Sequence, residues 1–176
     1  MYIRSTSLLA LTVLAVSVLT SCGEKKDDPG VPIVEKRPAP PALVPGISQN
    51  LTKSTKPAMV RLDRFGTVTN PAPQKPFQIA ADSSPLIMGW AIDETAKKLA
   101  GGIEVVLDQN PYIARTGVSR TDVAEYYKQP DYTLSGFELT LPPGQFTKGE
   151  HSVSIRVISS DKKSYFQGDV LKFVVN

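Results

Sequence analysis

The sequence predicts a mainly β protein: an antiparallel β-sandwich of seven or eight short strands with one short helix near residues 119–128, preceded by a disordered tether. From about Met59 onward, apolar and polar residues alternate with the period of two that marks half-buried strands. Turn residues separate these stretches roughly every ten residues, as in sandwich folds. Proline is concentrated before and at the beginning of this region. Because proline cannot donate a hydrogen bond to a β-ladder, the strand pattern is not expected to extend into the tether.

Residues 1–21 have the features of a signal peptide. Arg4 supplies a short positive beginning, and the apolar run Leu8–Leu19 follows it. This run is too short to span a hydrocarbon core about 30 Å thick, but it has the length and flanks of a secretory signal. The alternative is a buried core helix, which does not suit a run that is apolar on every face.

The run leads into Leu19-Thr20-Ser21-Cys22, which resembles the lipobox of bacterial lipoproteins. Small residues before the cysteine let the processing peptidase close on the backbone, and the thiol accepts the lipid. The resemblance implies lipidation at Cys22, the chain's single cysteine, and two or three acyl chains anchor a protein stably in a membrane. It also implies a cell-envelope location. Gly23 stands where an aspartate would signal inner-membrane retention in enteric bacteria, so the outer membrane is favoured over the inner membrane.

Residues 22–57 are predicted to be a Pro-rich disordered linker that carries the lipidated cysteine. No helical or alternating pattern survives there, and proline-rich chains favour an extended conformation of roughly 3.1 Å per residue. The linker is interpreted as a passive spacer. The alternative is a docking segment for a partner domain at Pro38–Pro41.

The globular domain is expected to occupy residues 58–176. Trp90 shares its predicted strand face with Leu86, Met88 and Ile92, so we expect it to lie in the core between the two sheets rather than to stack on a ligand. The other strong strands have their apolar faces at 103, 105 and 107; at 133, 135, 137, 139 and 141; at 153, 155 and 157; and at 171, 173 and 175. Weaker strand candidates are Val60–Arg64, Phe77–Ala81 and Tyr112–Arg115.

One segment, Ser119–Tyr127, departs from the strand pattern and predicts a short helix. Ser119 can cap it, and Asp122 lies three residues later in a loose capping-box arrangement. Pro130 is expected to end the helix.

Several motifs in this region resemble, in order and spacing, an immunoglobulin-like domain that recurs in bacterial envelope and surface proteins. The resemblance covers about residues 60–176 and implies fold and location, since the family has no agreed activity. Its motifs here are Leu62-Asp63-Arg64-Phe65-Gly66, Gly89-Trp90-Ala91-Ile92-Asp93, Gly101-Gly102, Val105-Val106-Leu107-Asp108, Arg120-Thr121-Asp122-Val123, Ser135-Gly136-Phe137 and Gly149-Glu150-His151.

Composition and charge exclude some classes of function. With 20 basic and 17 acidic side chains the charges are mixed, and Lys162-Lys163 is interpreted as solvated surface, so no nucleic-acid partner is expected. The lone histidine, His151, is interpreted as a packed or capping residue. No catalytic set, metal site or cofactor is predicted, because a histidine-based zinc site needs more than one histidine. Four scattered acids, Asp93, Glu94, Asp108 and Asp122, lack the spacing of a calcium loop.

The region from Tyr112 to Tyr132 is the candidate binding site. Tyrosine and arginine are enriched at binding hot spots, and tyrosine rings can also stack on sugars. A purely structural role for the region is the alternative, and Arg120 and Asp122 are expected to pin the helix to the sandwich. The proposed binding residues are Tyr112, Arg115, Tyr126, Tyr127 and Tyr132.

These observations predict a membrane-anchored, non-catalytic binding or structural module for a protein or glycan partner in the envelope, with protein favoured. An enzyme or accessory domain acting on envelope polysaccharide is the alternative. It predicts an activity that depends on Asp122 or His151. A third hypothesis is an inhibitor or adhesin exposed on the cell surface.

Overall fold

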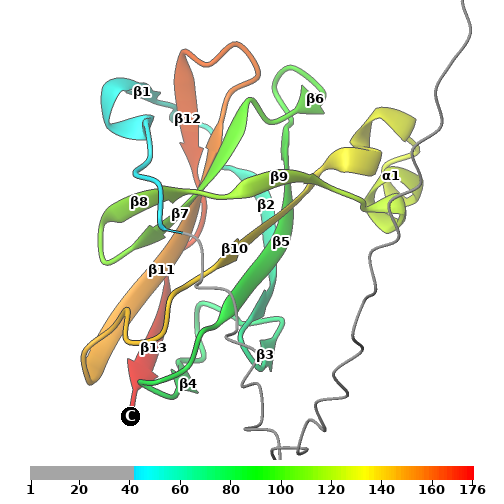
Figure 1. The fold of residues 1–176 in the computed structure, drawn as a ribbon. Helices are drawn as coiled ribbons and strands as arrows, with labels where there is room; N and C mark the ends of the chain where they lie inside the picture. The colour runs from blue at the N-terminus through cyan, green and yellow to red at the C-terminus, as the bar shows by residue number, and fades with distance from the viewer. Residues whose placement is uncertain (1–41) are drawn as a thin grey trace, which may run out of the picture. The chain divides into compact units, whose positions relative to one another are not determined.

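The computed structural model describes residues 42–176, which form two β-sheets and one short α-helix (Figure 1). These residues belong to one compact unit. The mainly β class predicted from the sequence is confirmed. The predictions for the signal peptide, for Cys22 and for the linker as far as residue 41 lie outside the described residues. Among the described residues, no helix is long and apolar enough to cross a membrane.

The first sheet is built around the long strand β11. Val153 of β11 pairs with both Leu107 and Leu171, so β7 lies on one side of β11 and β13 on the other. β7 also pairs with β8. β13 pairs with the first half of β11, and β12 pairs with its last three residues on the same side. The pairings are antiparallel except for β1 with β12 and β4 with β13. The strands are β1 (Thr52–Lys53), β4 (Phe77–Ile79), β7 (Gly102–Leu107), β8 (Asn110–Ile113), β11 (Gly149–Ile158), β12 (Ser164–Gln167) and β13 (Leu171–Val175).

The second sheet is antiparallel and has β5 at its centre. β5 pairs with β2 on one side and with β10 on the other, while β3 and β9 extend the two flanks. The short strand β6 continues the pairing at the end of β5. The strands are β2 (Met59–Phe65), β3 (Val68–Thr69), β5 (Leu86–Asp93), β6 (Lys98–Leu99), β9 (Arg115–Val118) and β10 (Gly136–Thr140).

The two sheets share one hydrophobic core. Phe65, Phe77 and Phe173 meet at its centre, with ring centroids 5.1 to 5.4 Å apart. Full burial of such a side chain stabilises the fold by about 1.5–3 kcal/mol. The faces predicted for the strands at 103–107, 153–157 and 171–175 are confirmed, because their alternating apolar residues all lie in this core.

The face predicted for β5 is wrong. The residues that point into the shared core are Ile87 and Ala91, with Gly89 between them, whereas Trp90 and Ile92 lie on the opposite face. Gly89 is required there because a Cβ would collide with the carbonyl oxygen of Arg61 and lie 2.8 Å from Phe137 Cζ. Trp90 therefore does not lie between the sheets.

The linker prediction is also corrected, because residues 43–53, here called the strap, pack along the first sheet. Backbone hydrogen bonds tie the strap to β8, from Gly46 N–H to Pro111 O (2.7 Å) and from Ile113 N–H to Val44 O (2.8 Å). The buried Glu104 of β7 accepts hydrogen bonds from the N–H groups of residues 47 and 48, at 2.6 and 2.9 Å. The short helix η1 (Ser48–Asn50) and β1 complete the strap.

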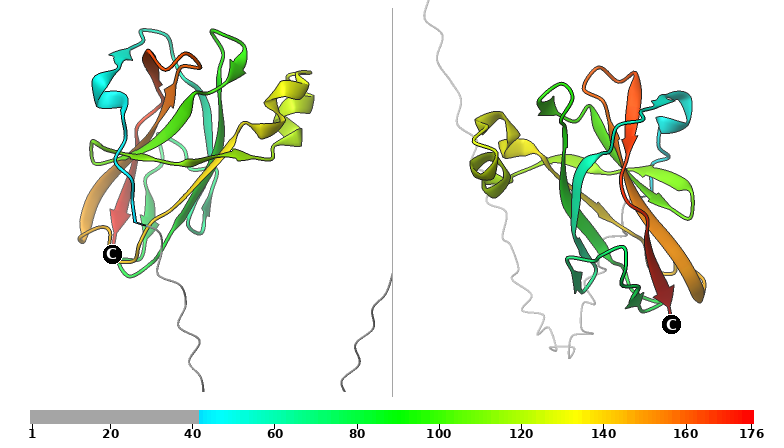
Figure 2. Two further views of the ribbon diagram at one scale, coloured as in Figure 1. Left: turned by 45° about the horizontal axis from the view of Figure 1, so that its top comes forward. Right: turned by 180° about the vertical axis from the view of Figure 1, so that it is seen from behind.

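Two local predictions need correction around the helix, which lies to one side of the two sheets in Figure 2. The α-helix α1 spans Thr121–Tyr126, and Ser119 does not cap it; the N-cap position is Arg120, which makes no side-chain capping bond. The strand expected over 133–141 is shorter, because Pro130–Leu134 form the 3-10 helix η2 and β10 begins only at Gly136.

Candidate functional site

Three of the predicted binding residues, Tyr126, Tyr127 and Tyr132, gather beside Trp90 on α1 and η2. Tyr127 is central, because its ring centroid lies 5.0 Å from that of Tyr126, 5.8 Å from that of Trp90 and 5.9 Å from that of Tyr132. All three contacts are edge-on, a geometry that aromatic rings prefer. We call these four residues the aromatic cluster. Tyr126 is its outermost member, with 80% of its surface exposed.

The chain reaches this arrangement through a helix only six residues long. Lys128 adopts φ +52°, which ends α1, and Pro130 then begins η2. Val123, Ala124 and Tyr132 are buried against Ile92 on the outer face of β5. Both faces of β5 are consequently covered, the inner one by the first sheet and the outer one by α1 and η2.

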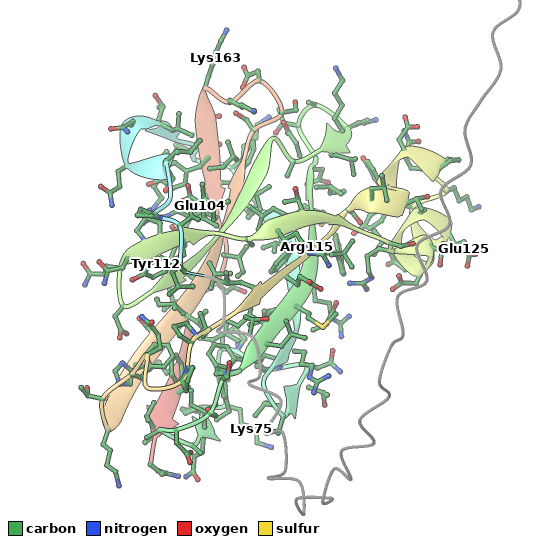
Figure 3. All side chains as sticks on the ribbon, viewed as in Figure 1. Lys75, Glu104, Tyr112, Arg115, Glu125 and Lys163 are labelled. Carbon is green, nitrogen blue, oxygen red and sulfur yellow. The ribbon has the colours of Figure 1, made fainter. Side chains whose placement is uncertain are left out.

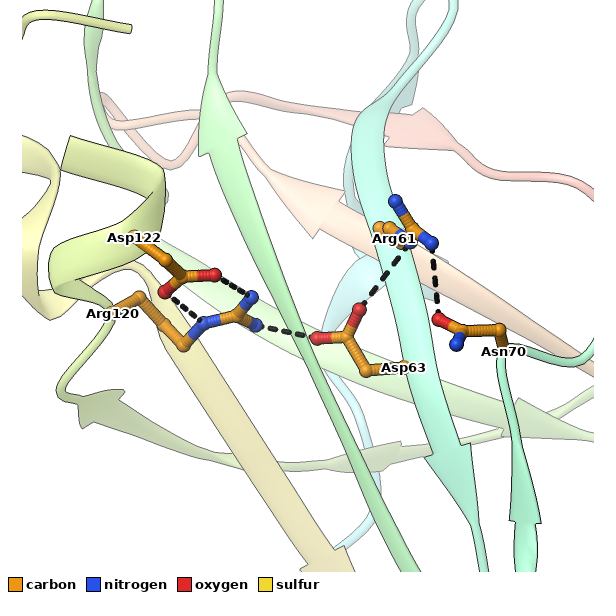
Figure 4. A network of polar contacts seen from close by, with 5 residues as sticks. All are labelled: Arg61, Asp63, Asn70, Arg120 and Asp122. Carbon is orange, nitrogen blue, oxygen red and sulfur yellow. Dashed lines mark hydrogen bonds and ion pairs between the residues drawn. The ribbon is translucent and has the colours of Figure 1, made fainter. Parts of the chain in front are cut away.

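Arg120 ties the helix to the second sheet through the ion-pair network shown in Figure 4. Its Nη1 lies 2.5 Å from Asp63 Oδ2 of β2, and its Nε and Nη2 donate to the Asp122 carboxylate at 2.9 and 2.7 Å. The hydrogen bond with Asp122 raises the pKa of Arg120, and the same contact lowers the pKa of Asp122 to about 2. Arg61 extends the network to Asn70 at 3.0 Å.

The aromatic cluster is chemically suited to binding rather than to proton transfer. Burial raises the pKa of both Tyr127 and Tyr132, and the negative charge of Glu94 contributes in each case. Their hydroxyls therefore stay neutral hydrogen-bond donors at physiological pH. The Tyr127 hydroxyl faces Met59 Sδ at 3.4 Å. What the cluster offers outward is flat aromatic surface, mainly that of Tyr126.

The structure does not bring the other two predicted binding residues, Tyr112 and Arg115, to this cluster. Tyr112 lies on β8 of the first sheet, opposite Val105, and packs half-buried against the shared core. Arg115 begins β9, and its exposed guanidinium pairs with Glu138 at 2.5 Å. Figure 3 labels both residues and shows them apart from α1. The structure therefore does not gather all five residues in one cluster, and a binding role for each remains a prediction.

His151 lies at the opposite end of the first sheet from the β11–β12 turn and is held on all sides. Its Nε2 faces the carbonyl oxygen of Thr147 at 2.8 Å, and its Nδ1 faces Asp108 Oδ2 at 2.5 Å. The ring also packs against Phe146 and Phe173, with centroids 4.9 and 5.5 Å away. Both ring nitrogens are thus engaged by the protein itself, which leaves neither for a substrate.

The four acids considered for calcium do not converge. Asp93 accepts backbone hydrogen bonds from Ala96 and Ser160, Asp108 faces His151, and Asp122 faces Arg120. Among residues 42–176, no group of three or more His, Cys, Asp or Glu side chains could hold a metal ion.

Two hollows flank the aromatic cluster, and sequence reasoning missed both. One of about 410 Å³ lies between α1 and η2 and is lined by Thr121, Ala124, Glu125, Lys128, Pro130 and Thr133. The other, of about 360 Å³, has an apolar floor of Met59, Ile92 and Phe166 and a rim that includes Lys56, Glu94 and Lys97. Residues of the second hollow come from three distant parts of the chain, so no local signal in the sequence indicates it.

Comparison with known proteins yields little. No known family model matches the sequence, and no curated protein matches it significantly. Among solved structures, the chain is similar to CopC from Methylosinus trichosporium OB3b, with 18% sequence identity and a TM-score of 0.33. That likeness covers 66% of this chain and 93% of CopC. It is too slight for any functional assignment to follow from it.

Proposed function

We propose that this protein is a lipid-anchored, non-catalytic binding module of the bacterial cell envelope. Its immunoglobulin-like β-sandwich would present the aromatic cluster to a protein partner, while Cys22 holds the chain in a membrane, with the outer membrane favoured over the inner one. The observation that carries the binding role is the exposure of Tyr126, at 80%, on a rigid aromatic support. Tyrosines supply large contact area at low entropic cost and are enriched at binding hot spots.

The sandwich interpretation is supported by the way the two sheets share their core. Both sheets contribute alternating residues to one apolar cluster, as in aligned sandwich folds. The chain passes from the first sheet to the second between β8 and β9, around the buried Ala114. Such changes of sheet are a recurring device of sandwich folds.

The fixed position of α1, which carries part of the aromatic cluster, supports a role in binding a partner. Arg120 is only 20% exposed in its side chain and is held by two carboxylates, so α1 has a fixed position relative to β2. A surface that is already ordered loses little conformational entropy on binding, and this improves affinity. The adjoining hollows provide depressions into which side chains of a protein partner could fit.

The binding role is tested by affinity capture with a single exposed substitution. Tyr126→Ser removes the outermost ring and leaves the buried members of the cluster in place. Val170→Ser is the matched control, because Val170 is also an exposed apolar residue, at 56%, but lies in the loop before β13. We expect a specific envelope protein to bind the parent chain and the control, and to bind the Tyr126 variant at least tenfold more weakly. Equal binding by both variants contradicts the proposed site.

The anchor is tested separately by metabolic labelling with a palmitate analogue. Incorporation into the parent chain, and its loss in Cys22→Ser, is the expected result. Absence of label from the parent chain contradicts the lipoprotein assignment. Protease treatment of intact cells then distinguishes a periplasm-facing module from one exposed on the cell surface.

A further inference from the structure

One end of the two sheets carries a concentration of lysines that come from three separate parts of the sequence. The strap meets the β11–β12 turn there, since Thr52 N–H donates to Lys163 O at 3.3 Å. The β5–β6 turn joins them, because Asp93 Oδ2 accepts a hydrogen bond from Ser160 N–H at 2.8 Å. Figure 3 shows Lys163 at this end and Lys75 at the opposite end. We call this surface the lysine-rich end; it consists of Lys53, Lys56, Lys97, Lys98, Lys162 and Lys163.

Neighbouring acids offset only part of the charge of these lysines. All six are exposed, and within residues 42–176 none lies within 4.0 Å of a carboxylate oxygen. Three acids are nearby: Asp93, Glu94 and Asp161. Asp93 is buried and accepts backbone hydrogen bonds through both oxygens, and Asp161 accepts from the Ser159 hydroxyl and from Lys163 N–H. Their charges leave a clear positive excess at this end.

The rest of the described domain is almost balanced. Apart from the lysine-rich end and its three acids, residues 42–176 contain nine basic and ten acidic side chains. The net positive charge of these residues therefore resides at one end. Like charges gathered in this way repel one another, and a surface that keeps them is matched to a negative partner.

The distribution of the lysines identifies the kind of partner. They are divided among three chain segments, at residues 53–56, 97–98 and 162–163, instead of sharing one loop, so they suit an extended anionic surface better than a single small ion. Lysine also acts as a flexible point charge, whereas arginine provides fixed bidentate geometry. Diffuse attraction of this type is how basic protein surfaces recognise anionic lipids, at about 1 kcal/mol for each lysine near the membrane.

The chain is long enough to bring this end to a membrane that holds Cys22. The segment from Cys22 to Ala42 spans at most about 70 Å when fully extended. β11, with ten residues, is about 33 Å long, and it is the longest strand of the domain. The anchor therefore leaves any face of the domain free to reach the lipid surface.

We propose that the lysine-rich end docks on the anionic phosphate headgroups of the membrane in which Cys22 is anchored. This inference rests on the lipid anchor of the proposed function, which determines the membrane concerned. β6 of this end contacts η2, which carries part of the aromatic cluster. Docking at the lysine-rich end therefore holds the aromatic cluster close to the membrane surface.

The test is vesicle co-sedimentation of the mature chain from Cys22 onward carrying Cys22→Ser, so that no lipid contributes to binding. We expect this chain to bind vesicles that contain phosphatidylglycerol, to ignore vesicles of phosphatidylcholine alone, and to dissociate as salt is raised. A triple variant carries Lys97→Gln, Lys98→Gln and Lys163→Gln. The matched control carries Lys75→Gln, Lys148→Gln and Lys172→Gln; these lysines are also exposed but lie outside the lysine-rich end.

Each lysine removed from the docking surface should weaken binding about fivefold, so the triple variant should bind about a hundredfold more weakly than the parent. The control should lose less than about fivefold. Equal losses in the two variants would show that only overall charge matters and would overturn the proposal. So would binding of the parent chain to soluble polyphosphate without binding to vesicles. Since Cys22 is absent throughout, failure here overturns the docking surface alone, whereas failure of palmitate labelling overturns the anchor.

Discussion

Asp108 and His151 form an ion pair whose contribution to stability depends on pH. A carbonyl oxygen and a carboxylate only accept hydrogen bonds, so the contacts of His151 with Thr147 and Asp108 require a proton on both ring nitrogens. Burial alone would lower the pKa of His151, but the hydrogen bonds to Asp108 and Thr147 outweigh it and raise the pKa above 6.5. Burial raises the pKa of Asp108, and the hydrogen bonds from His151 and Ser152 outweigh it, so that pKa falls below 3.8.

The sign of each effect follows from these directions. The stabilisation from His151 is complete below pH 6.5 and is lost as the pH rises through the folded-state pKa. The stabilisation from Asp108 is present above pH 3.8 and is lost as the pH falls through its folded-state pKa. The pair therefore stabilises the fold most between these two values. We expect about 1 kcal/mol, the upper end for a surface pair, because the histidine side chain is only 12% exposed although the carboxylate is 42% exposed.

The substitution Asp108→Asn isolates the contribution of the Asp108–His151 ion pair to stability. An asparagine keeps an oxygen for the Ser152 N–H, and its amide can donate to the neutral ring but not to the protonated one. Urea denaturation should show the variant about 1 kcal/mol less stable at pH 5.5 and nearly equal to the parent at pH 9. Because His151 is the only histidine, one imidazole resonance reports its titration directly. An equal loss of stability at both pH values, or a folded-state pKa below 6.5 in the parent chain, would refute the reasoning.

Three further substitutions test the packing. Gly89→Ala places a Cβ against the Arg61 carbonyl oxygen and should destabilise the fold by about 3 kcal/mol or more in urea denaturation; a loss below about 1 kcal/mol would contradict the close approach of β2 and β5. Arg120→Met removes both ion pairs of α1 and should cost about 1–2 kcal/mol, with faster proteolysis within 119–134; unchanged proteolysis there would argue against its tying role. Glu104→Ala leaves two strap N–H groups without their acceptor and should cost about 2 kcal/mol by urea denaturation, with new cleavage in the strap; an intact strap would contradict this role.

Three strands of the first sheet, β7, β11 and β13, could be predicted from the sequence because one face of each is more strongly apolar than the other. In β13, for example, Leu171 and Phe173 are buried while Lys172 between them is exposed. Such alternation indicates unambiguously which face of the strand is buried. It identified the core faces of β7, β11 and β13 and the mainly β class.

The same reasoning failed for β5 because both of its faces are covered. Its inner face carries the small residues Gly89 and Ala91, which allow close packing, and its outer face carries the larger Trp90. Periodicity favours the face with larger apolar residues, and here that face packs against α1 and η2. The sequence contains no local signal that a helix returns to cover a strand some 30 residues earlier.

The strap and the lysine-rich end were missed for a related reason. Prolines and the absence of alternation made residues 43–53 resemble linker, yet their backbone groups are satisfied by β8, β12 and the distant Glu104. The lysines occur as short, separate groups in the sequence, and only the meeting of three loops gathers them. In the aromatic cluster, by contrast, three tyrosines lie within seven residues, so sequence proximity was enough to suggest that they meet.

Site-specific photo-crosslinking in living cells tests most directly whether the aromatic cluster is a binding surface. A photoreactive phenylalanine analogue at position 126 occupies the most exposed site of the cluster, and the same analogue at Gln78, exposed on β4, is the control. The proposed function predicts a discrete crosslinked protein from position 126 that is absent from position 78 and disappears when Arg120→Met loosens the helix. The same adducts from both positions, or none from position 126 in cells that anchor the protein normally, would contradict it.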